Sequence, residues 1–367
     1  MPRDAGNDLS PRSGVLLAAY FDLRTDEGPL HARSVADMGR CFLAGQPIPA
    51  YQSVTGSGLR GLIAADAPEL PHINDPRELE RPRRTREWDY LCDQLSRWDD
   101  LADERRLATA QVLFKLGFWQ TLVSLPITTA APDARPVAVG WQLARIQYSA
   151  SMKLQGRDDF VLPPELRDVF ARLARDDGSP VAKRLGAAVN LLVHHARYDR
   201  SRQEITRWHD VARGLVSAAS PGDLSLVLLS AYWRGSSFAP FFDHDHAQVA
   251  QMLDKAEHTA TQAVEQAEPD QRVLALENLR LVLMTRARAA SGADDQIAEE
   301  SYVHRLARLD PLDSHAHVLL ANFLFKAGRV DEARLGYLAA ARLGAPFTEL
   351  AQLQALRCAA SAAGLTV

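Results

Sequence analysis

Residues 314–346 constrain the fold of this chain most, because they carry the pattern of two helices joined by a tight turn. Apolar residues recur at three- and four-residue spacing on both sides of Gly328, which is the spacing of amphipathic helices. Asp310 and Pro311 precede the stretch, and Pro346 closes it. Because proline stops a helix and glycine enters turn conformations readily, these residues are predicted to form one helix–turn–helix unit.

The residue types within this unit follow the period of about 34 residues that is typical of tetratricopeptide repeats (TPRs). When Ser314 is counted as the first position, large, small, aromatic and turn residues fall where that family places them. They are Leu320, Ala321, Leu324, Gly328, Ala333, Tyr337 and Ala340. Small Ala321 and Ala333 let two helices approach closely. The stretch therefore resembles a TPR, and the preceding unit matches only in its second helix, at Val303 and Leu306.

Helical spacing continues almost without interruption from Thr85 onward, with short connections and no alternating strand pattern. Short connections make successive helices antiparallel neighbours. We therefore expect an all-α fold, a right-handed α-solenoid of antiparallel helix pairs as the TPR resemblance implies. Three regions are predicted: an irregular N-terminal segment at 1–84, a divergent stack of helical hairpins at 85–270, and TPR-like repeats at 271–367. One helical face near the start of the second region carries Trp88, Leu91, Cys92, Leu95 and Trp98.

Composition narrows the function classes. The chain has 367 residues and a formal net charge of −4, which argues against general nucleic-acid binding because such binding depends on phosphate neutralisation. Three scattered cysteines without a CxxC pair indicate reduced thiols. The start of the chain lacks an apolar signal core, and the apolar runs are too short to span a bilayer. A cytoplasmic protein is expected, and the excess of arginine over lysine with many alanines indicates a GC-rich bacterial genome.

In TPR proteins the first helix of each pair lines a concave groove that binds peptides. The residues at the matching positions are His315, Val318, Asn322, Phe325 and Lys326. Asn322 and Lys326 resemble the residues that hold a peptide backbone or a carboxylate. The alternative is that the last predicted helix, at 348–363, caps this face.

Tyr232, Trp233 and Arg234 precede a Gly-Ser-Ser turn in a predicted loop over residues 234–243. Two aromatic rings with one guanidinium suit an anionic or aromatic ligand. The alternative is an aromatic-rich corner between two helices. His194 and His195 follow an apolar run, and we expect one of them to be buried and the other exposed.

The densest group of ligand-type side chains comprises Asp243, His244, Asp245 and His246. Imidazole and carboxylate suit zinc, so Asp243, His244 and His246 are weak metal candidates. Their spacing matches no known site, and we favour the alternative that Asp243 or Asp245 caps a helix beginning near Ala247. No cofactor is predicted. A GxGxxG match at residues 56–61 lacks the strand that a dinucleotide site needs, and a loop is the better interpretation.

The leading functional hypothesis is a protein- or peptide-binding TPR-like scaffold or adaptor. The first alternative is an enzyme, or a protein binding a small molecule or modified peptide in a biosynthetic pathway, with its site around residues 234–246. The second is a TPR-type regulator. Catalysis stays open, with the sequence leaning against it. Leu350, Leu353 and Leu356 on the last predicted helix are where a homodimer would form.

Overall fold

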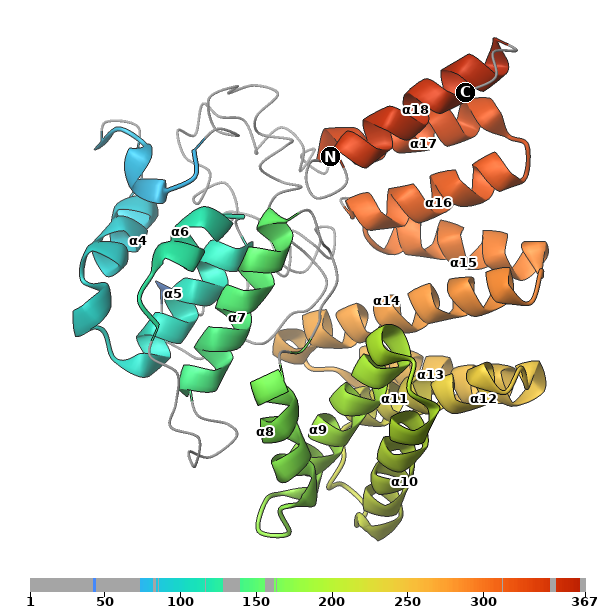
Figure 1. The fold of residues 1–367 in the computed structure, drawn as a ribbon, viewed down its shortest axis with the longest axis horizontal. Helices are drawn as coiled ribbons and strands as arrows, with labels where there is room; N and C mark the ends of the chain where they lie inside the picture. Colours follow the sequence, from blue (N-terminus) through green and yellow to red (C-terminus); the bar gives the residue numbers. More distant parts are fainter. Residues whose placement is uncertain are drawn as a thin grey trace. The chain divides into compact units, whose positions relative to one another are not determined.

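The computed structural model describes residues 42–43, 73–81, 84, 86–115, 117–127, 139–155, 162, 164–311, 313–343 and 348–363. Every regular element within these residues is helical, which confirms the prediction of an all-α chain (Figure 1). Among the described residues, none of the helices has the length and apolar character needed to cross a bilayer. The right-handed solenoid stays a prediction.

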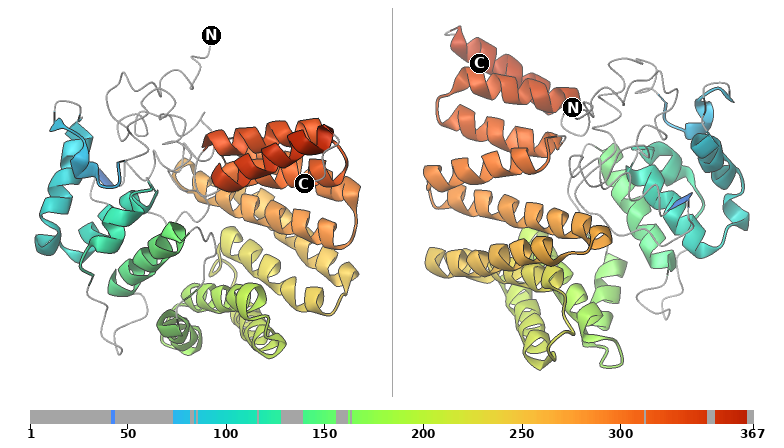
Figure 2. Two further views of the ribbon diagram at one scale, coloured as in Figure 1. Left: turned by 45° about the horizontal axis from the view of Figure 1, so that its top comes forward. Right: turned by 180° about the vertical axis from the view of Figure 1, so that it is seen from behind.

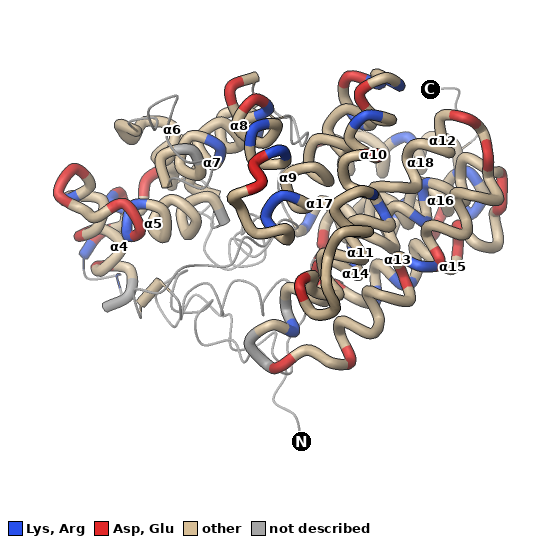
Figure 3. Tube along the Cα trace, turned by 90° about the horizontal axis from the view of Figure 1, so that it is seen from below, with Lys and Arg blue, Asp and Glu red and all other residues tan. Residues whose placement is uncertain are grey.

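The chain divides into two compact units. The first comprises residues 1–130, 142–159 and 303–367, and the second comprises residues 131–141 and 160–302. Acidic and basic residues alternate along the chain in the helices of both units (Figure 3). The predicted boundaries at residues 84 and 270 stay predictions.

The first unit begins with short helices around a tryptophan-rich core. The elements are η3 (Pro76–Glu78), α4 (Arg86–Ser96), η5 (Trp98–Asp100), α5 (Asp103–Lys115), α6 (Trp119–Ser124) and α7 (Val139–Leu154). The helical face predicted from Trp88 to Trp98 is buried throughout. Gln147 of α7 donates from its amide nitrogen to the carbonyl oxygens of Leu122, Val123 and Leu125, at 3.2, 3.0 and 2.9 Å. One side chain thus satisfies the end of α6 and fastens α7 to it.

The same unit contains the C-terminal helices α16 (Ser314–Lys326), α17 (Val330–Leu343) and α18 (Thr348–Ala362). Asp313 caps α16 by accepting a hydrogen bond of 3.0 Å from the amide of His315. Gly328 has a φ of 77°, in the left-handed region that the sequence predicted for it. The three helices lie side by side and reverse direction in turn (Figure 2), so residues 314–343 form a helix–turn–helix, as predicted, and the last three residues of the predicted unit lie outside the described residues.

The second unit is a stack of longer helices. They are α8 (Pro164–Arg175), α9 (Val181–His194), the π-helical segment η6 (His195–Asp199), α10 (Arg202–Ala218), α11 (Leu226–Ser236), α12 (Phe238–Phe242), α13 (His246–Gln266) and α14 (Pro269–Gly292), followed by the start of α15 (Gln296–Leu309). α9 packs against α8, α10 and α11, and α11 packs in turn against α13 and α14. Leu192, Trp208 and Tyr232 lie in the core that these contacts enclose.

The prediction of a loop over residues 234–243 is wrong, because α11 continues to Ser236 and α12 follows after Ser237. Ser237 keeps helical dihedral angles and its hydroxyl donates to the carbonyl of Arg234 at 2.7 Å. Gly235 forms no turn, and its role is to allow close packing of two helices. A Cβ atom on this residue would lie 3.3 Å from Cδ2 of Leu192, so the missing side chain lets α11 approach α9.

Candidate functional site

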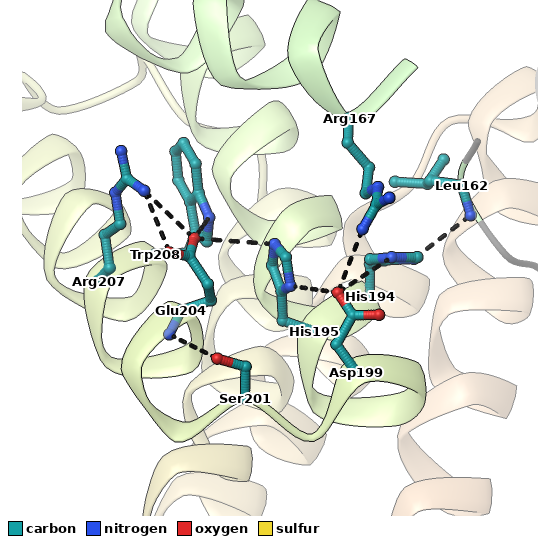
Figure 4. Close-up of polar contacts among 9 residues, drawn as sticks. All are labelled: Leu162, Arg167, His194, His195, Asp199, Ser201, Glu204, Arg207 and Trp208. Atoms are coloured by element: carbon teal, nitrogen blue, oxygen red, sulfur yellow. Dashed lines mark hydrogen bonds and ion pairs between the residues drawn. The ribbon is translucent and has the colours of Figure 1, made fainter. Parts of the chain in front are cut away.

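The junction between α9 and α10 holds a network of polar contacts that joins several helices of the second unit (Figure 4). Its backbone is unusual, because His195–Asp199 form a π-helical segment and Arg200 then has a left-handed φ of 49°. Ser201 restarts the chain as the N-cap of α10, accepting from the amide of Glu204 at 3.4 Å. Short π-helical segments are frequent at functional sites, and this one places His195 near Glu204 of α10 and Asp199 near Arg167 of α8.

The imidazole of His195 lies between two carboxylates. Its Nδ1 is 2.8 Å from Oδ2 of Asp199, and its Nε2 is 3.9 Å from Oε2 of Glu204. Glu204 is held in place by the indole N–H of Trp208 at 3.1 Å and by Nη1 of Arg207 at 3.1 Å. The histidine therefore hydrogen-bonds to Asp199 of its own segment through one ring nitrogen and lies near Glu204 of α10 through the other.

His194 is buried as well, so the expectation that one of the two histidines would be exposed is wrong. Its Nδ1 accepts from the amide of Leu162 at 3.3 Å, which leaves the ring proton on Nε2. That Nε2 lies 3.7 Å from Oδ2 of Asp199, beyond hydrogen-bonding distance. Burial lowers the pKa of His194 to about 4, although the charge of Asp199 acts in the opposite direction.

The carboxylates of the histidine network are matched by arginines, although Nε2 of His194 has no hydrogen-bond partner among the described residues. Oδ2 of Asp199 also lies 3.3 Å from Nη1 of Arg167 on α8, so one carboxylate joins α8 to the π-helical segment. Asp199 and Glu204 face Arg167 and Arg207, and His194 is neutral at pH 7 because of its low pKa. A balanced network of this kind fixes the junction between helices and offers little net charge to a ligand.

A group of arginines in the same unit differs from this network, because the charged groups in it are all positive. Arg234 lies on α11, and the two charged groups that act on it are Arg197 of the π-helical segment and Arg288 of α14. The Nε atom of Arg234 is shielded from solvent and forms no hydrogen bond within the described part of the chain. Burial, together with the charges of Arg197 and Arg288, lowers the pKa of Arg234 to about 10. The guanidinium is still a cation at neutral pH, and its surroundings add positive charge to it.

The two aromatic residues of the predicted Tyr232–Trp233–Arg234 site have packing roles. Their ring centroids are 4.9 Å apart, and Tyr232 is buried in the core of the second unit. The face of Trp233 is covered by Lys255 of α13, whose Nζ is 4.6 Å from the ring centroid. Arg234 is the member of the three that carries an unsatisfied polar atom.

The predicted acidic and histidine cluster serves mainly as a helix start. The carboxylate of Asp245 accepts from the amide of Gln248 at 2.9 Å, which confirms the capping interpretation. Asp243 forms an ion pair with Arg202 of α10. His244 and His246 are exposed on either side of Asp245. Within the described part of the chain, no group of three or more His, Cys, Asp or Glu side chains is arranged to hold a metal ion.

The structure separates the predicted groove residues of α16 into two sets. Val318 is buried and His315 is partly buried, whereas Asn322, Phe325 and Lys326 are exposed. Asn322 is already engaged, since its Oδ1 accepts a hydrogen bond of 2.7 Å from the hydroxyl of Tyr337.

Sequence reasoning missed Asp199, Glu204, Arg197 and Arg288. The sequence did contain a signal for the contact between His195 and Asp199. The two residues are four positions apart, which is the spacing of interacting side chains on a helix. The arginines gave no such signal, since each lies on a different element.

In comparisons with protein families, curated proteins and solved structures, the chain matches none.

Proposed function

We propose that this protein is a TPR-like helical scaffold that binds an anionic segment of a protein or peptide partner, with Arg234 as the recognition point. The observation that carries the proposal is the partly buried guanidinium of Arg234, whose Nε has no hydrogen-bond partner among the described residues and which lies within the field of two further arginines.

The energetics favour a ligand at this position. An unpaired buried charge costs several kcal/mol in a protein, and neighbouring charges of the same sign add to the cost. An oxyanion beside the guanidinium of Arg234 would offset its positive charge and the repulsion from Arg197. Arginine is suited to this role because its planar group binds carboxylates and phosphates through paired hydrogen bonds.

The C-terminal helices support the scaffold part of the proposal. Gly328 has the left-handed conformation of a helix-ending glycine, and small residues separate α16 from α17 where Ala321 faces Gly336. Tyr337 and Ala340 are buried, as a TPR requires of its aromatic and small positions. Scaffolds of stacked helix pairs bind extended segments through many modest contacts on a rigid surface.

The shared chemistry of the ligand is an oxyanion, which either a carboxylate or a phosphate group supplies. Binding is tested by fluorescence anisotropy with a labelled glutamate-rich peptide, a labelled phosphoserine peptide and a labelled uncharged peptide. We expect at least one anionic peptide to bind and the uncharged peptide to fail. Saturation by only one of the anionic peptides identifies the source of the oxyanion. If neither anionic peptide binds, the proposal is overturned.

The variant Arg234→Met tests the site itself, because methionine keeps much of the side-chain length and removes the charge. We expect the affinity for the anionic peptide to fall by at least about tenfold, a loss of roughly 1.4 kcal/mol. The matched control is Arg213→Met on α10, where the arginine pairs with Asp210 and is 63% exposed. Equal affinity of Arg234→Met and the unchanged protein would contradict the assignment.

A stability measurement distinguishes lost recognition from misfolding. Because Arg234→Met removes a partly buried cation on which, among the described residues, arginines and no carboxylate act, the variant should unfold at a higher temperature than the unchanged protein. Weaker peptide binding in a more stable variant therefore reports on the ligand contact.

A further inference from the structure

Helix α18 carries its small apolar residues inward and its large ones outward. Ala351, Ala355 and Cys358 are buried, and α18 packs against α17. Leu350, Leu353 and Leu356 are 44%, 51% and 69% exposed. Three leucines on the outer face of one helix form a patch that water does not favour, and such patches mark interaction sites.

The outer face of α18 has a symmetrical sequence about Leu353. Leu350 and Leu356 lie three residues before and after it, and Glu349 and Arg357 lie four residues before and after it. At 3.6 residues per turn, all four fall within about 60° of Leu353 around the helix axis. The buried Ala351, Ala355 and Cys358 fall on the opposite side by the same rule, which agrees with their burial.

This symmetry matches what a two-fold axis requires. If two α18 helices pack antiparallel with the axis at Leu353, each Leu350 faces Leu356 of the second copy. Each Glu349 then faces Arg357 of the second copy, which gives two ion pairs of opposite charge at the rim of an apolar centre. Within the part of the chain that the structure describes, neither Glu349 nor Arg357 has an ion-pair partner, and both are exposed.

We propose that the outer face of α18 binds a second copy of this chain in an antiparallel helix pair centred on Leu353. The charge pattern selects this occupant, because an isologous interface must be complementary to itself. A helix of an unrelated protein would need no such balance of Glu349 against Arg357. The proposal is independent of the anion site at Arg234.

The first test is the mass of the full chain in solution, measured by sedimentation velocity over a range of concentrations. The unchanged protein should sediment as a dimer that dissociates on dilution. Leu353→Asp should sediment as a monomer at concentrations where the unchanged protein is dimeric. The matched control is Leu335→Asp, since Leu335 is a 65% exposed leucine on α17, and this variant should remain dimeric.

A charge exchange tests the orientation of the two helices. Either Glu349→Arg or Arg357→Glu alone places like charges opposite each other at both ends of the pair, and should raise the dissociation constant of the dimer at least about tenfold. The double variant Glu349→Arg/Arg357→Glu restores opposite charges and should recover the affinity. Failure of the double variant to recover would rule out the antiparallel register.

Cross-linking locates the axis. In the proposed dimer, residue 353 meets the same residue of the second copy, so Leu353→Cys should form an intermolecular disulfide under mild oxidation. Leu335→Cys, away from the axis, should not. A monomeric unchanged protein at all concentrations, a dimer that survives Leu353→Asp, or equal cross-linking of both cysteine variants would each overturn the proposal.

Discussion

Gly336 of α17 lies directly against Ala321 of α16. A Cβ atom added to Gly336 would be 3.0 Å from the Cβ atom of Ala321, which is tighter than most contacts of Cβ atoms in proteins. The two helices thus meet at a pair of residues that are both small. The repeat pattern predicted that Ala321 lies at the contact between the two helices. It did not predict Gly336 there, although Gly336 sets how closely the helices approach.

Replacement of Gly336 by alanine should therefore bring no gain in stability. An alanine in a helix is favoured over glycine by about 0.5–1 kcal/mol, but the added methyl group here must push α16 away. The matched control is Gly214→Ala on α10, where nothing lies within 4 Å of the new atom. We expect Gly214→Ala to be stabilising and Gly336→Ala to be neutral or destabilising in urea denaturation.

A compensating change checks the cause. Ala321→Gly removes the methyl group that Gly336→Ala would meet, so the double variant should be more stable than the two separate effects predict. Strict additivity of the two substitutions would show that the contact does not limit the approach of the helices.

Gly328 ends α16 with a φ of 77°, and the amide of Arg329 donates back to the carbonyl of Leu324 at 2.9 Å. Gly328→Ala should lower the free energy of unfolding by about 1 kcal/mol, because a Cβ atom is strained in this conformation. Gly328→Asn should cost less, since asparagine tolerates the left-handed region. An alanine variant as stable as the unchanged protein would contradict this explanation, with thermal unfolding as the measurement.

His194 should make stability depend on pH below neutrality. An unfolded histidine binds its proton with a pKa of about 6.5, whereas burial lowers the pKa of His194 in the folded protein to about 4. Between these values the unfolded chain holds more protons, so the stability contributed by the neutral ring is complete above pH 6.5. It is lost as the pH falls to 4, by about 3 kcal/mol in total.

The measurement is urea denaturation of the unchanged protein and His194→Gln at several pH values between 7 and 4. Glutamine keeps an acceptor for the amide of Leu162 but does not titrate. The stability of His194→Gln should fall less steeply over this range. A parallel pH dependence of the two proteins would show that His194 is not the group responsible.

Replacement of the Gln147 amide by a carboxylate should destabilise the folded protein. Its amide nitrogen faces three carbonyl oxygens at the end of α6, and Gln147→Glu would place an acceptor against acceptors. We expect a loss of about 1–3 kcal/mol in the free energy of unfolding at pH 7. Gln203→Glu, at an exposed position of α10, serves as the control and should change stability by less than about 0.5 kcal/mol.

Local signals in the sequence were sufficient where a residue acts on its own helix. The cap at Asp245, the turn at Gly328 and the buried face from Trp88 to Trp98 all depend on spacing within a few turns, and all are confirmed. The Gly-Ser-Ser segment misled the prediction for residues 234–243. Its glycine signals a turn in isolation, yet Gly235 serves close packing of α11 on α9.

Periodicity along single segments was enough to predict the helical class of the described residues, the helical hairpin over 314–343 and the outward leucines of α18. The burial of both His194 and His195, and the action of Arg197 and Arg288 on Arg234, became evident only in three dimensions. The charges that act on Arg234 come from the π-helical segment and from α14, so their effect depends on how separate helices pack. Spacing along the chain carries no information about that packing, whereas the close approach of the helices fixes which charges meet.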